Sequence, residues 1–357
     1  MVLRDASAYN VQFDRGRPIL IDALSFERWR RGEPWVAYRQ FCEHFLAPLA
    51  LMAQRDVRCG LMLRDFVDGI PLGLAARLLP TSSRFRLGLG THIHLHARAQ
   101  HGAASAARGR DAKSATLSPA RFEALVDSLR STVDRLSWRP TGTVWTDYET
   151  TTSYTATAAD SKARLVDALL RRATGATVWD LGANTGRYSR LAAETGRWVL
   201  ALDADAGAAE RHYLDLRSAG DDRVLPLVVD LANPSPALGW AGRERRSITE
   251  RANADILLAL ALVHHIAIGG NVPLPSLSAF LAQLGRQLII EFVPKSDPRV
   301  AGMLAHRRDV FAGYSLDGFR AAFGEHWKAL DERPIEDSER VLFLFRRRAD
   351  QLRGGAG

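Results

Sequence analysis

The amino-acid sequence predicts an α/β protein built on a Rossmann-like, mostly parallel seven-stranded sheet that follows a mainly helical domain. From residue 158 onward, short apolar runs alternate with amphipathic helical patterns, as expected when helices cover both faces of a parallel sheet. Only a short turn joins the last two apolar runs, which predicts an antiparallel C-terminal strand pair. The expected strands are residues 176–182, 197–203, 223–230, 254–262, 286–293, 327–335 and 340–348.

The residues ahead of this pattern predict a separate N-terminal domain. Two short apolar runs flank a turn in residues 10–26 and predict a hairpin, and residues 33–56 carry apolar side chains at helical spacing. Residues 97–119 hold almost no large apolar side chain and are expected to form a linker. A helix capped by Ser118 is expected to lead the second domain. The expected domains are an accessory domain that sets acceptor specificity at 1–115 and the sheet domain at 116–350.

The composition is that of a globular protein. The 357 residues are 46% hydrophobic and 25% charged. No apolar run approaches the roughly 20 residues that span a membrane, and the first residues lack the apolar core of a secretory signal. Cys42 and Cys59 are the only cysteines, which gives no disulfide framework. We therefore expect a cytoplasmic protein that does not associate with membranes.

The formal net charge of +8 raises the question of a nucleic-acid partner. The positive charge is spread along the chain in arginine pairs, such as Arg30–Arg31 and Arg307–Arg308, and is not gathered in one tract. Binding to phosphates depends on clustered basic side chains. A nucleic-acid partner is therefore possible but not favoured, and the sequence leaves the oligomeric state open.

The stretch from Thr177 to Asp205, TVWDLGANTGRYSRLAAETGRWVLALDAD, predicts a ligand site at the carboxyl ends of neighbouring strands. Gly182 and Gly186 allow a tight turn after the first strand, and the next helix points its amino end at the same place. Acids end the first three strands, where they can accept hydrogen bonds from a ribose and an adenine amine. The loop has Asn184 in place of the middle glycine of a dinucleotide fingerprint, and the carboxylate of Asp180, which faces the loop, repels a pyrophosphate but suits a cation or an ammonium group. The strand-end acids are Asp180, Asp203 and Asp230.

These residues resemble the first motif of class I S-adenosylmethionine-dependent methyltransferases, over about residues 158–348. The resemblance implies S-adenosylmethionine as cofactor, with the loop around its methionine part and an aromatic segment at Tyr148 and Tyr154 as a lid. Packing is the alternative role of these two tyrosines. A cofactor-free Rossmann-like scaffold and a nicotinamide enzyme are the alternatives. The cofactor-binding residues that we predict are Asp180, Gly182, Asn184, Gly186, Asp203, Asp230, Leu231 and Tyr154.

More narrowly, the sequence is similar to bacterial methyltransferases described as rhizobial host-specific nodulation proteins. The segments that carry this likeness are YNVQFDRGRPILIDALSFE, EPWVAYRQFCEHFLAPL, DLGANTG, LVHHIAIGGNVPL and IIEFVPKSDP. The substrates of that group are poorly defined, so the likeness indicates a related protein group but does not identify the reaction.

His264, His265 and Glu291 are the candidate catalytic residues. Either histidine follows the fourth strand, beside the expected sulfonium position, and can accept the proton of an acceptor hydroxyl. The alternative is that both bond to the backbone at the strand end. Glu291 ends the fifth strand, where it can position the acceptor, fix a histidine tautomer, or form an ion pair with Lys295 or an arginine.

Two patterns in the N-terminal domain suggest further chemistry. Asp5, Asn10 and Asp22 have the spacing of a kinase catalytic loop, but the sequence given begins just before them, so we do not expect kinase activity. The run His92, His94 and His96 would share one face in a strand and could then bind zinc, whereas in a helix the three would fan apart. We favour a polar, structural or substrate-facing role for them and predict no metal site.

The sequence therefore predicts methyl transfer from S-adenosylmethionine to a small-molecule, saccharide-like or natural-product acceptor, at oxygen. The place after the fourth strand lacks the Asn/Asp-Pro-Pro-aromatic run of methyltransferases that modify adenine or glutamine nitrogen. RNA methylation and a non-catalytic, cofactor-binding partner protein are the alternatives. The acceptor itself cannot be named from the sequence.

Overall fold

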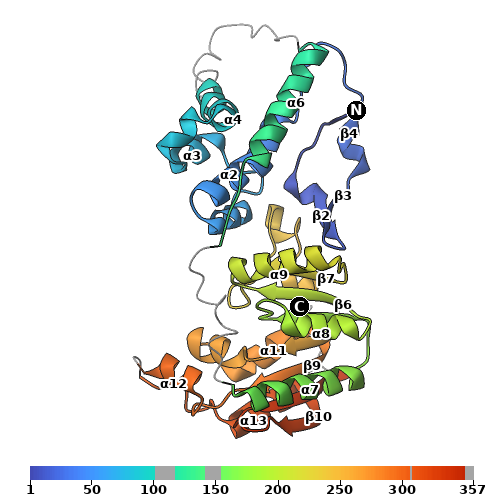
Figure 1. The fold of residues 1–357 in the computed structure, drawn as a ribbon, viewed down its shortest axis with the longest axis vertical. Coiled ribbons are helices and arrows are strands. Elements are labelled where there is room, and N and C mark those ends of the chain that lie inside the picture. The colour runs from blue at the N-terminus through green and yellow to red at the C-terminus, as the bar shows by residue number, and fades with distance from the viewer. Residues whose placement is uncertain (101–116, 141–153, 306–307, 350–357) are drawn as a thin grey trace. The chain divides into compact units, whose positions relative to one another are not determined.

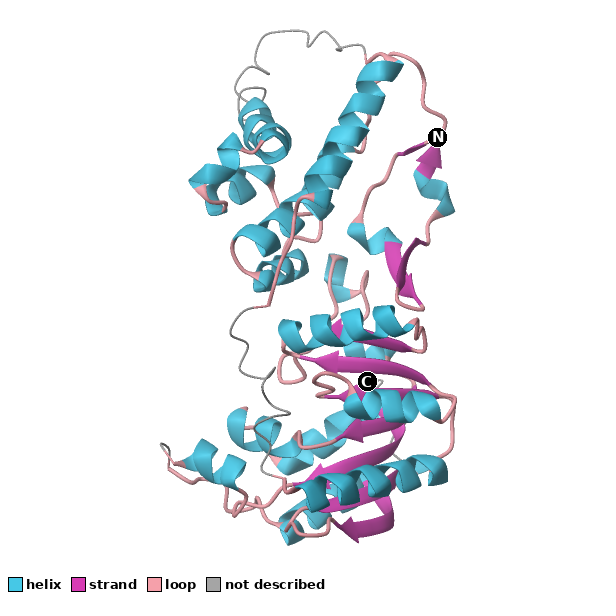
Figure 2. Cartoon of the chain, in the orientation of Figure 1, coloured by secondary structure: helices cyan, strands magenta, loops and turns pink. Residues whose placement is uncertain are grey.

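The protein consists of two compact units, Met1–Arg139 and Pro140–Gly357 (Figure 1). Figure 2 shows that the first is mostly helical and the second holds the large sheet. The computed structural model describes residues 1–100, 117–140, 154–305 and 308–349.

The boundary between the units lies after the helix that we expected to lead the second domain. This helix, α6 (Pro119–Asp134), buries Leu129 in the core of the first unit. Ser118 caps it as predicted, accepting a hydrogen bond from the backbone N–H of Arg121 at 3.4 Å. The apolar stripe of α6 therefore moves the expected boundary from residues 115 and 116 to residues 139 and 140.

The first unit contains the predicted hairpin and helices. Strand β2 pairs antiparallel with β3, and residues 38–54 of the expected helical segment are helical. Its strands and α-helices are β1 (Val2–Leu3), β2 (Val11–Asp14), β3 (Arg17–Leu20), β4 (Phe26–Glu27), α1 (Tyr38–Phe41), α2 (Ala47–Gln54), α3 (Leu72–Leu78), α4 (Leu87–Leu89) and α6. The 3-10 helices are η1 (Ala8–Asn10), η2 (Ala23–Ser25), η4 (Val57–Arg64) and η5 (Thr81–Phe85), and the π-helices are η3 (Cys42–Leu46) and η6 (Gly90–Leu95).

The expected linker at residues 97–119 is described only at its two ends. The helical run that includes η6 continues to Gln100, so the first four linker residues are helical. Leu117 forms an isolated antiparallel bridge with Gly32 in the same unit. The remaining linker residues, 101–116, lie outside the described part of the chain.

The second unit is the predicted seven-stranded sheet with its helices. Its strands are β5 (Thr177–Leu181), β6 (Trp198–Asp203), β7 (Val224–Val228), β8 (Ala254–Ala259), β9 (Gly285–Phe292), β10 (Trp327–Pro334) and β11 (Val341–Arg347). Its helices are α7 (Ala156–Arg172), α8 (Arg187–Glu194), α9 (Ala206–Ala219), α10 (Ile248–Arg251), α11 (Leu274–Leu284), α12 (Pro298–Leu304) and α13 (Leu316–His326), with the 3-10 helix η7 (Trp240–Gly242) and the π-helix η8 (His265–Gly269).

The strand order is β10-β11-β9-β8-β5-β6-β7. Strand β11 runs antiparallel to both of its neighbours, and the other neighbouring strands are parallel, as the sequence predicts. The chain adds β6 and β7 on one side of β5 and then crosses to place β8 on the other side. This crossing creates a switch point beyond the carboxyl end of β5, where an open α/β sheet binds its ligand.

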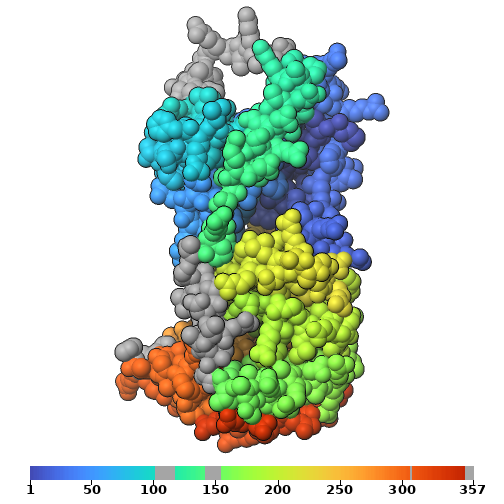
Figure 3. All heavy atoms as spheres, in the orientation of Figure 1, coloured from blue at the N-terminus to red at the C-terminus, as the bar shows by residue number. Residues whose placement is uncertain are grey.

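Two apolar cores hold helices against the two faces of the sheet. On one face, side chains of α7, α8 and α9 pack with Ile256 and Leu258 of β8. On the other face, side chains of α11 and α13 pack with Leu257 and Ala259 of the same strand. This alternation along β8 follows from the two-residue period of a strand. Figure 3 shows side chains of α7, α8 and α9 covering the first of these faces.

Among the residues that the structure describes, no helix combines the length and the apolar character needed to cross a membrane.

Candidate cofactor and active site

The loop after β5, residues 182–186, is fastened to the end of the neighbouring strand β6. The backbone N–H groups of Gly182 and Ala183 both donate to the carbonyl oxygen of Leu202, at 2.8 and 3.0 Å. Asn184, with a φ of 48°, turns its own N–H toward Oδ2 of Asp203 at 2.7 Å. The loop therefore takes its shape from hydrogen bonds to β6 as well as from its glycines.

Asp203 faces both the loop and a cavity. Its Oδ1 accepts a hydrogen bond from the N–H of Asp205 at 2.8 Å, and its Oδ2 accepts the one from Asn184. Burial raises the pKa of this carboxyl group, and the two backbone donors oppose that rise. Each carboxylate oxygen can accept a second hydrogen bond, so Asp203 retains capacity for a ligand.

A cavity of about 230 Å³ lies at the ends of four neighbouring strands, and we call it the Asp203 cavity. It brings together Asp203, Asp230 and His265, three of the side chains that the sequence predicts at the ligand site, whereas Asp180 does not line it. Asp230, whose Oδ1 accepts from the N–H of Ala232 at 2.8 Å, is exposed in its wall. The lining residues are Gly182, Asn184, Leu202, Asp203, Ala204, Val229, Asp230, Leu231, Ala232, Leu260, Ala261, Leu262, His265 and Ile266.

A second cavity of about 530 Å³ shares Gly182, Asn184, Leu260 and Ala261 with the first, and we call it the Tyr154 cavity. The shared residues place the two cavities next to each other along the strand ends. Unlike the first, the Tyr154 cavity has cationic side chains in its wall. It is lined by Tyr154, Thr155, Ala156, Ala159, Lys162, Asp180, Gly182, Ala183, Asn184, Thr185, Arg187, Tyr188, Leu260 and Ala261.

Asp180 is a buried acid in the wall of the Tyr154 cavity. Its Oδ2 accepts a hydrogen bond from the hydroxyl of Ser189 on α8 at 2.6 Å. Burial raises the pKa of the Asp180 carboxyl group to about 6, although the Ser189 hydroxyl opposes the rise. Near neutral pH the group is therefore ionised at a cost in stability, as expected of an acid kept for binding rather than packing.

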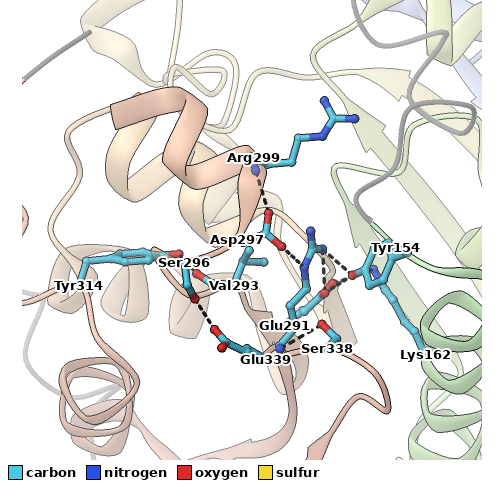
Figure 4. A network of polar contacts seen from close by, with 11 residues as sticks. Tyr154, Lys162, Glu291, Val293, Ser296, Asp297, Arg299, Tyr314, Ser338 and Glu339 are labelled. Carbon is cyan, nitrogen blue, oxygen red and sulfur yellow. Dashed lines mark hydrogen bonds and ion pairs between the residues drawn. The ribbon is translucent and has the colours of Figure 1, made fainter. Parts of the chain in front are cut away.

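Glu291, a predicted catalytic residue, lies behind the cavity wall at the centre of a buried ionic network (Figure 4). Its Oε2 lies 2.7 Å from Nζ of Lys162, and its Oε1 lies 3.2 Å from Nη1 of Arg340 and accepts a hydrogen bond from the Tyr154 hydroxyl. Burial raises the pKa of Glu291, but the two cations outweigh it and hold the pKa at about 2. Glu291 is thus a permanent anion that lines neither cavity.

The same network fixes the phenol of Tyr154 in the cavity wall. The Tyr154 hydroxyl accepts hydrogen bonds from Lys162 at 3.0 Å and from Arg340 at 2.6 Å. The Arg340 guanidinium also donates through Nε to Asp297, the cap of α12, at 2.8 Å. The sequence left open whether Glu291 pairs with Lys295 or an arginine; it pairs with Arg340, while Lys295 pairs with Asp309 at 2.7 Å.

Lys162 is the site residue that sequence reasoning missed. It lies on α7, on the buried stripe that also carries Val166 and Leu170, and its side chain is 5% exposed. A lysine four and eight residues before two buried apolar residues is the sequence signal that could have identified it, because a charge on a buried helix face needs a buried partner. The partner, Glu291, lies 129 residues away on β9, and no local pattern connects the two.

The two strand-end histidines lie in different surroundings. His265 is half-buried and lines the Asp203 cavity, whereas His264 is fully buried, lines neither cavity, and has no hydrogen-bond partner for either ring nitrogen within the described structure. Burial lowers the pKa of both, to about 3 for His264, and Arg299 and Arg340 lower that of His265 further. His265 is therefore the one of the pair that meets the cavity, as a neutral imidazole.

The kinase-like trio of the first unit takes part in local structure. Oδ1 of Asp5 accepts from Nε2 of Gln40 at 2.7 Å, and Nδ2 of Asn10 donates to the Ser25 hydroxyl at 3.2 Å. Asp22 caps η2 through the N–H of Leu24 at 2.9 Å. These contacts give each of the three side chains a partner within the first unit.

The histidine run lies in η6 and its helical continuation, so its members do not share a strand face. His92 contacts the Tyr38 hydroxyl through Nδ1 at 2.8 Å, and His94 contacts the Ser83 hydroxyl at 2.7 Å. The ring of His96 stacks on Tyr38 with centroids 4.9 Å apart. These contacts support the structural role that we favoured. Tyr148, the other predicted lid residue, lies outside the described part of the chain.

No family model matches the chain. The chain is 36% identical to nodulation protein NoeA of Rhizobium meliloti strain 1021 over 349 residues, which cover 97% of this chain and 73% of that protein. The chain belongs to the NoeA family. The sheet order and the three strand-end acids described above agree with the class I S-adenosylmethionine-dependent methyltransferase fold that the sequence predicts for this NoeA relative.

Solved methyltransferase structures also superpose on this NoeA relative. The N-methyltransferase NodS of Bradyrhizobium japonicum WM9 matches with a TM-score of 0.40 and 10% identity, over 53% of this chain and 96% of that chain. Magnesium protoporphyrin IX methyltransferase of Synechocystis PCC 6803 gives 0.38 and 16%, over 54% and 85%. The bifunctional kinase-methyltransferase WbdD gives 0.40 and 16%, over 56% of this chain and 41% of that chain.

Replacing Asp180 with asparagine is expected to stabilise the second unit at neutral pH, because asparagine keeps an acceptor for Ser189 but carries no buried charge. The folded-state pKa is raised to about 6, so wild type gains stability as pH falls through that value and loses it as pH rises. The unfolding temperature of Asp180→Asn should exceed that of wild type by about 5 °C at pH 8 and by about half of that at pH 5. Asp160→Asn, at an exposed position on α7, is the control. An equal gain at both pH values contradicts the assignment.

Truncating Glu291 is expected to cost far more stability than truncating an exposed glutamate. Glu291→Ala leaves Lys162 and Arg340 buried without their shared anion, which should lower the free energy of unfolding by about 3–5 kcal/mol. Glu336→Ala removes an exposed pair with Arg164 and should change it by about 1 kcal/mol or less. Urea denaturation measures both, and similar losses in the two variants would show that the network does not hold the unit together.

Proposed function

We propose that this member of the NoeA family transfers the methyl group of S-adenosylmethionine to a hydroxyl oxygen of a small molecule, such as a saccharide or natural product. The observation that carries the proposal is that His265 shares a cavity with Asp203 and Asp230. A proton acceptor and the two acids suited to adenosine thus line one cavity. The two adjoining cavities together are of the size that small ligands occupy.

The Asp203 cavity suits the adenosine part of the cofactor. The free lone pairs of Asp203 would accept the ribose hydroxyl hydrogens, and the exposed carboxylate of Asp230 would accept the adenine amine. Leu231, next to it in the wall, supplies apolar surface for the adenine ring. The sequence predicts all three as cofactor-binding residues.

The Tyr154 cavity suits the methionine part. Its wall presents an acid, Asp180, and two cations, Lys162 and Arg187, as required by a group that carries both an ammonium and a carboxylate. Tyr154 is held between Lys162 and Arg340 and closes one side of the cavity. We therefore retain Tyr154 as a cofactor-binding residue and add Lys162. Because Glu291 holds both in place from behind, we propose a positioning role for it in place of a catalytic one.

His265 is proposed as the base of the reaction. The bound cofactor supplies an electrophilic methyl carbon, and the protein supplies orientation and a proton acceptor. As the acceptor oxygen bonds to this carbon and the carbon–sulfur bond breaks, the hydroxyl proton moves to the unprotonated nitrogen of His265. Burial and the nearby arginines favour the neutral imidazole that this step needs.

The proposed partners and location follow the same observations. The net charge is the one feature that favours RNA as acceptor, so we retain a small molecule as the partner. A reducing, cytoplasmic location is supported by Cys42 and Cys59, which are both free thiols.

Asp203→Ala is expected to weaken the binding of S-adenosylhomocysteine by about 1–3 kcal/mol, because hydrogen bonds to the ribose are lost and the loop loses its anchor at Asn184. Isothermal titration calorimetry measures the dissociation constant directly. Asp215→Ala, an exposed acid on α9, should leave it unchanged. Unaltered affinity in Asp203→Ala removes the ribose role.

His265→Gln is expected to lower kcat by about 10²–10⁴-fold, with little change in the dissociation constant of S-adenosylhomocysteine, because a base is lost. His264→Gln, which changes a ring that lines neither cavity, should affect kcat far less. The assay follows S-adenosylhomocysteine formation with a panel of hydroxyl-bearing saccharides and phenols. If His265→Gln instead weakens cofactor binding and spares kcat, His265 contacts the adenosine and is not the base.

A further inference from the structure

We propose that His212, a buried histidine on α9, is a positioning residue for the cofactor loop, residues 182–186. Its ring packs against Gly186 and thereby holds the loop in the conformation that binds the cofactor. The proposal rests on the proposed cofactor binding, because the loop lies between the two cavities. His212 lines neither cavity and belongs to no motif that the sequence suggested.

The first observation is a contact too close for any side chain at residue 186. Gly186 caps α8 with a φ of +84°, a left-handed conformation. A Cβ placed on it would lie 2.0 Å from both Cε1 and Nε2 of His212 and 2.4 Å from its Cδ2. Real Cβ atoms never approach other atoms so closely, so the imidazole ring occupies the space that glycine leaves free. The ring and the loop backbone are therefore fitted to each other.

The second observation is the state of the ring. The side chain is fully buried, and neither ring nitrogen has a hydrogen-bond partner among the described residues. Burial lowers the pKa of His212 to about 4, and nearby Arg190 lowers it further against the opposing effect of Asp221. The ring is thus neutral and makes no hydrogen bond with the described residues. Its contribution to the loop is therefore steric packing.

The third observation is that α9 and its capping residue contact both Asp203, the acid that anchors the loop, and the loop itself. Asp205 caps α9 by accepting from the N–H of Gly207 at 2.7 Å, and its own N–H donates to Oδ1 of Asp203 at 2.8 Å. Nearly two turns further along the same helix, His212 contacts Gly186. One helix therefore sets the position of Asp203 at its start and of the loop at its middle, which keeps the acid and Asn184 in register.

The test compares two glycines that share a backbone conformation but differ in their surroundings. Gly196 has a φ of +86°, and a Cβ there would meet nothing within 4 Å, so Gly196→Ala measures left-handed strain alone. We expect Gly186→Ala to weaken S-adenosylhomocysteine binding by at least 100-fold and Gly196→Ala by less than threefold. Adding His212→Ala to Gly186→Ala removes the clash and should restore at least tenfold of the lost affinity. No recovery in the double variant overturns the proposal.

A second comparison separates positioning from general support of the core. Leu216 is a buried residue on the same helix, one turn beyond His212. We expect His212→Ala and Leu216→Ala to lower the unfolding temperature, but only His212→Ala to raise the KM for S-adenosylmethionine, by five- to twentyfold, with kcat within twofold of wild type. Equal KM values in the two variants would reduce His212 to a packing residue and overturn the inference.

The failure of this inference can be distinguished from the failure of the proposed function. If wild type does not bind S-adenosylhomocysteine in calorimetry, the proposed function fails and there is no cofactor site for His212 to position. If wild type binds it and the double variant shows no recovery, only the role of His212 fails.

Discussion

The candidate site depends on the hydrogen bond from the backbone N–H of Asn184 to Asp203, 2.7 Å long, which joins the loop after β5 to the end of β6. Left-handed residues are costly outside glycine, and Asn184 takes up such a conformation at a φ of 48°. The loop can keep this conformation because Asp203 accepts a hydrogen bond from the N–H that the turn exposes. The carbonyl oxygen of Leu202 accepts two further hydrogen bonds from N–H groups of the loop. The acid that faces the ligand cavity is thus also the acid that shapes the loop.

A different kind of constraint holds the other end of the site. Glu291, Asp297, Lys162 and Arg340 form a buried set of two anions and two cations, tying α7 and the turn before β11 to the end of β9. Apolar residues of the same volume often give equal or greater stability, because buried charges must first lose their water. They would not, however, place an ammonium group and a fixed phenol in the wall of the Tyr154 cavity. The network is therefore better explained by the side chains that it holds in the cavity wall than by the stability that it adds.

The parts of the structure that the sequence predicts are those fixed by local pattern. The seven strands, the loop glycines and the strand-end acids follow from short-range periodicity and from the meeting of parallel strand ends at one edge. The parts that escape prediction depend on contacts between distant residues or on side-chain direction. The pairing of Glu291 with Lys162 and Arg340 joins three separate elements, and α6 packs into the first unit through Leu129. Which of His264 and His265 faces the cavity depends on one turn of a π-helix.

The carboxylates along the strand ends support the proposed sulfonium nucleoside over a dinucleotide. Asp180 lines the Tyr154 cavity and Asp203 the adjoining one, with Gly182 and Asn184 shared between them. A pyrophosphate lying along this loop would run between two carboxylates in a partly dry site, where like charges a few ångströms apart repel by about 4 kcal/mol at an effective dielectric constant near 20. The same two carboxylates attract a cationic ligand. Burial raises the pKa of Asp180, so its negative charge is costly in the folded protein, and a cation bound beside it would reduce that cost.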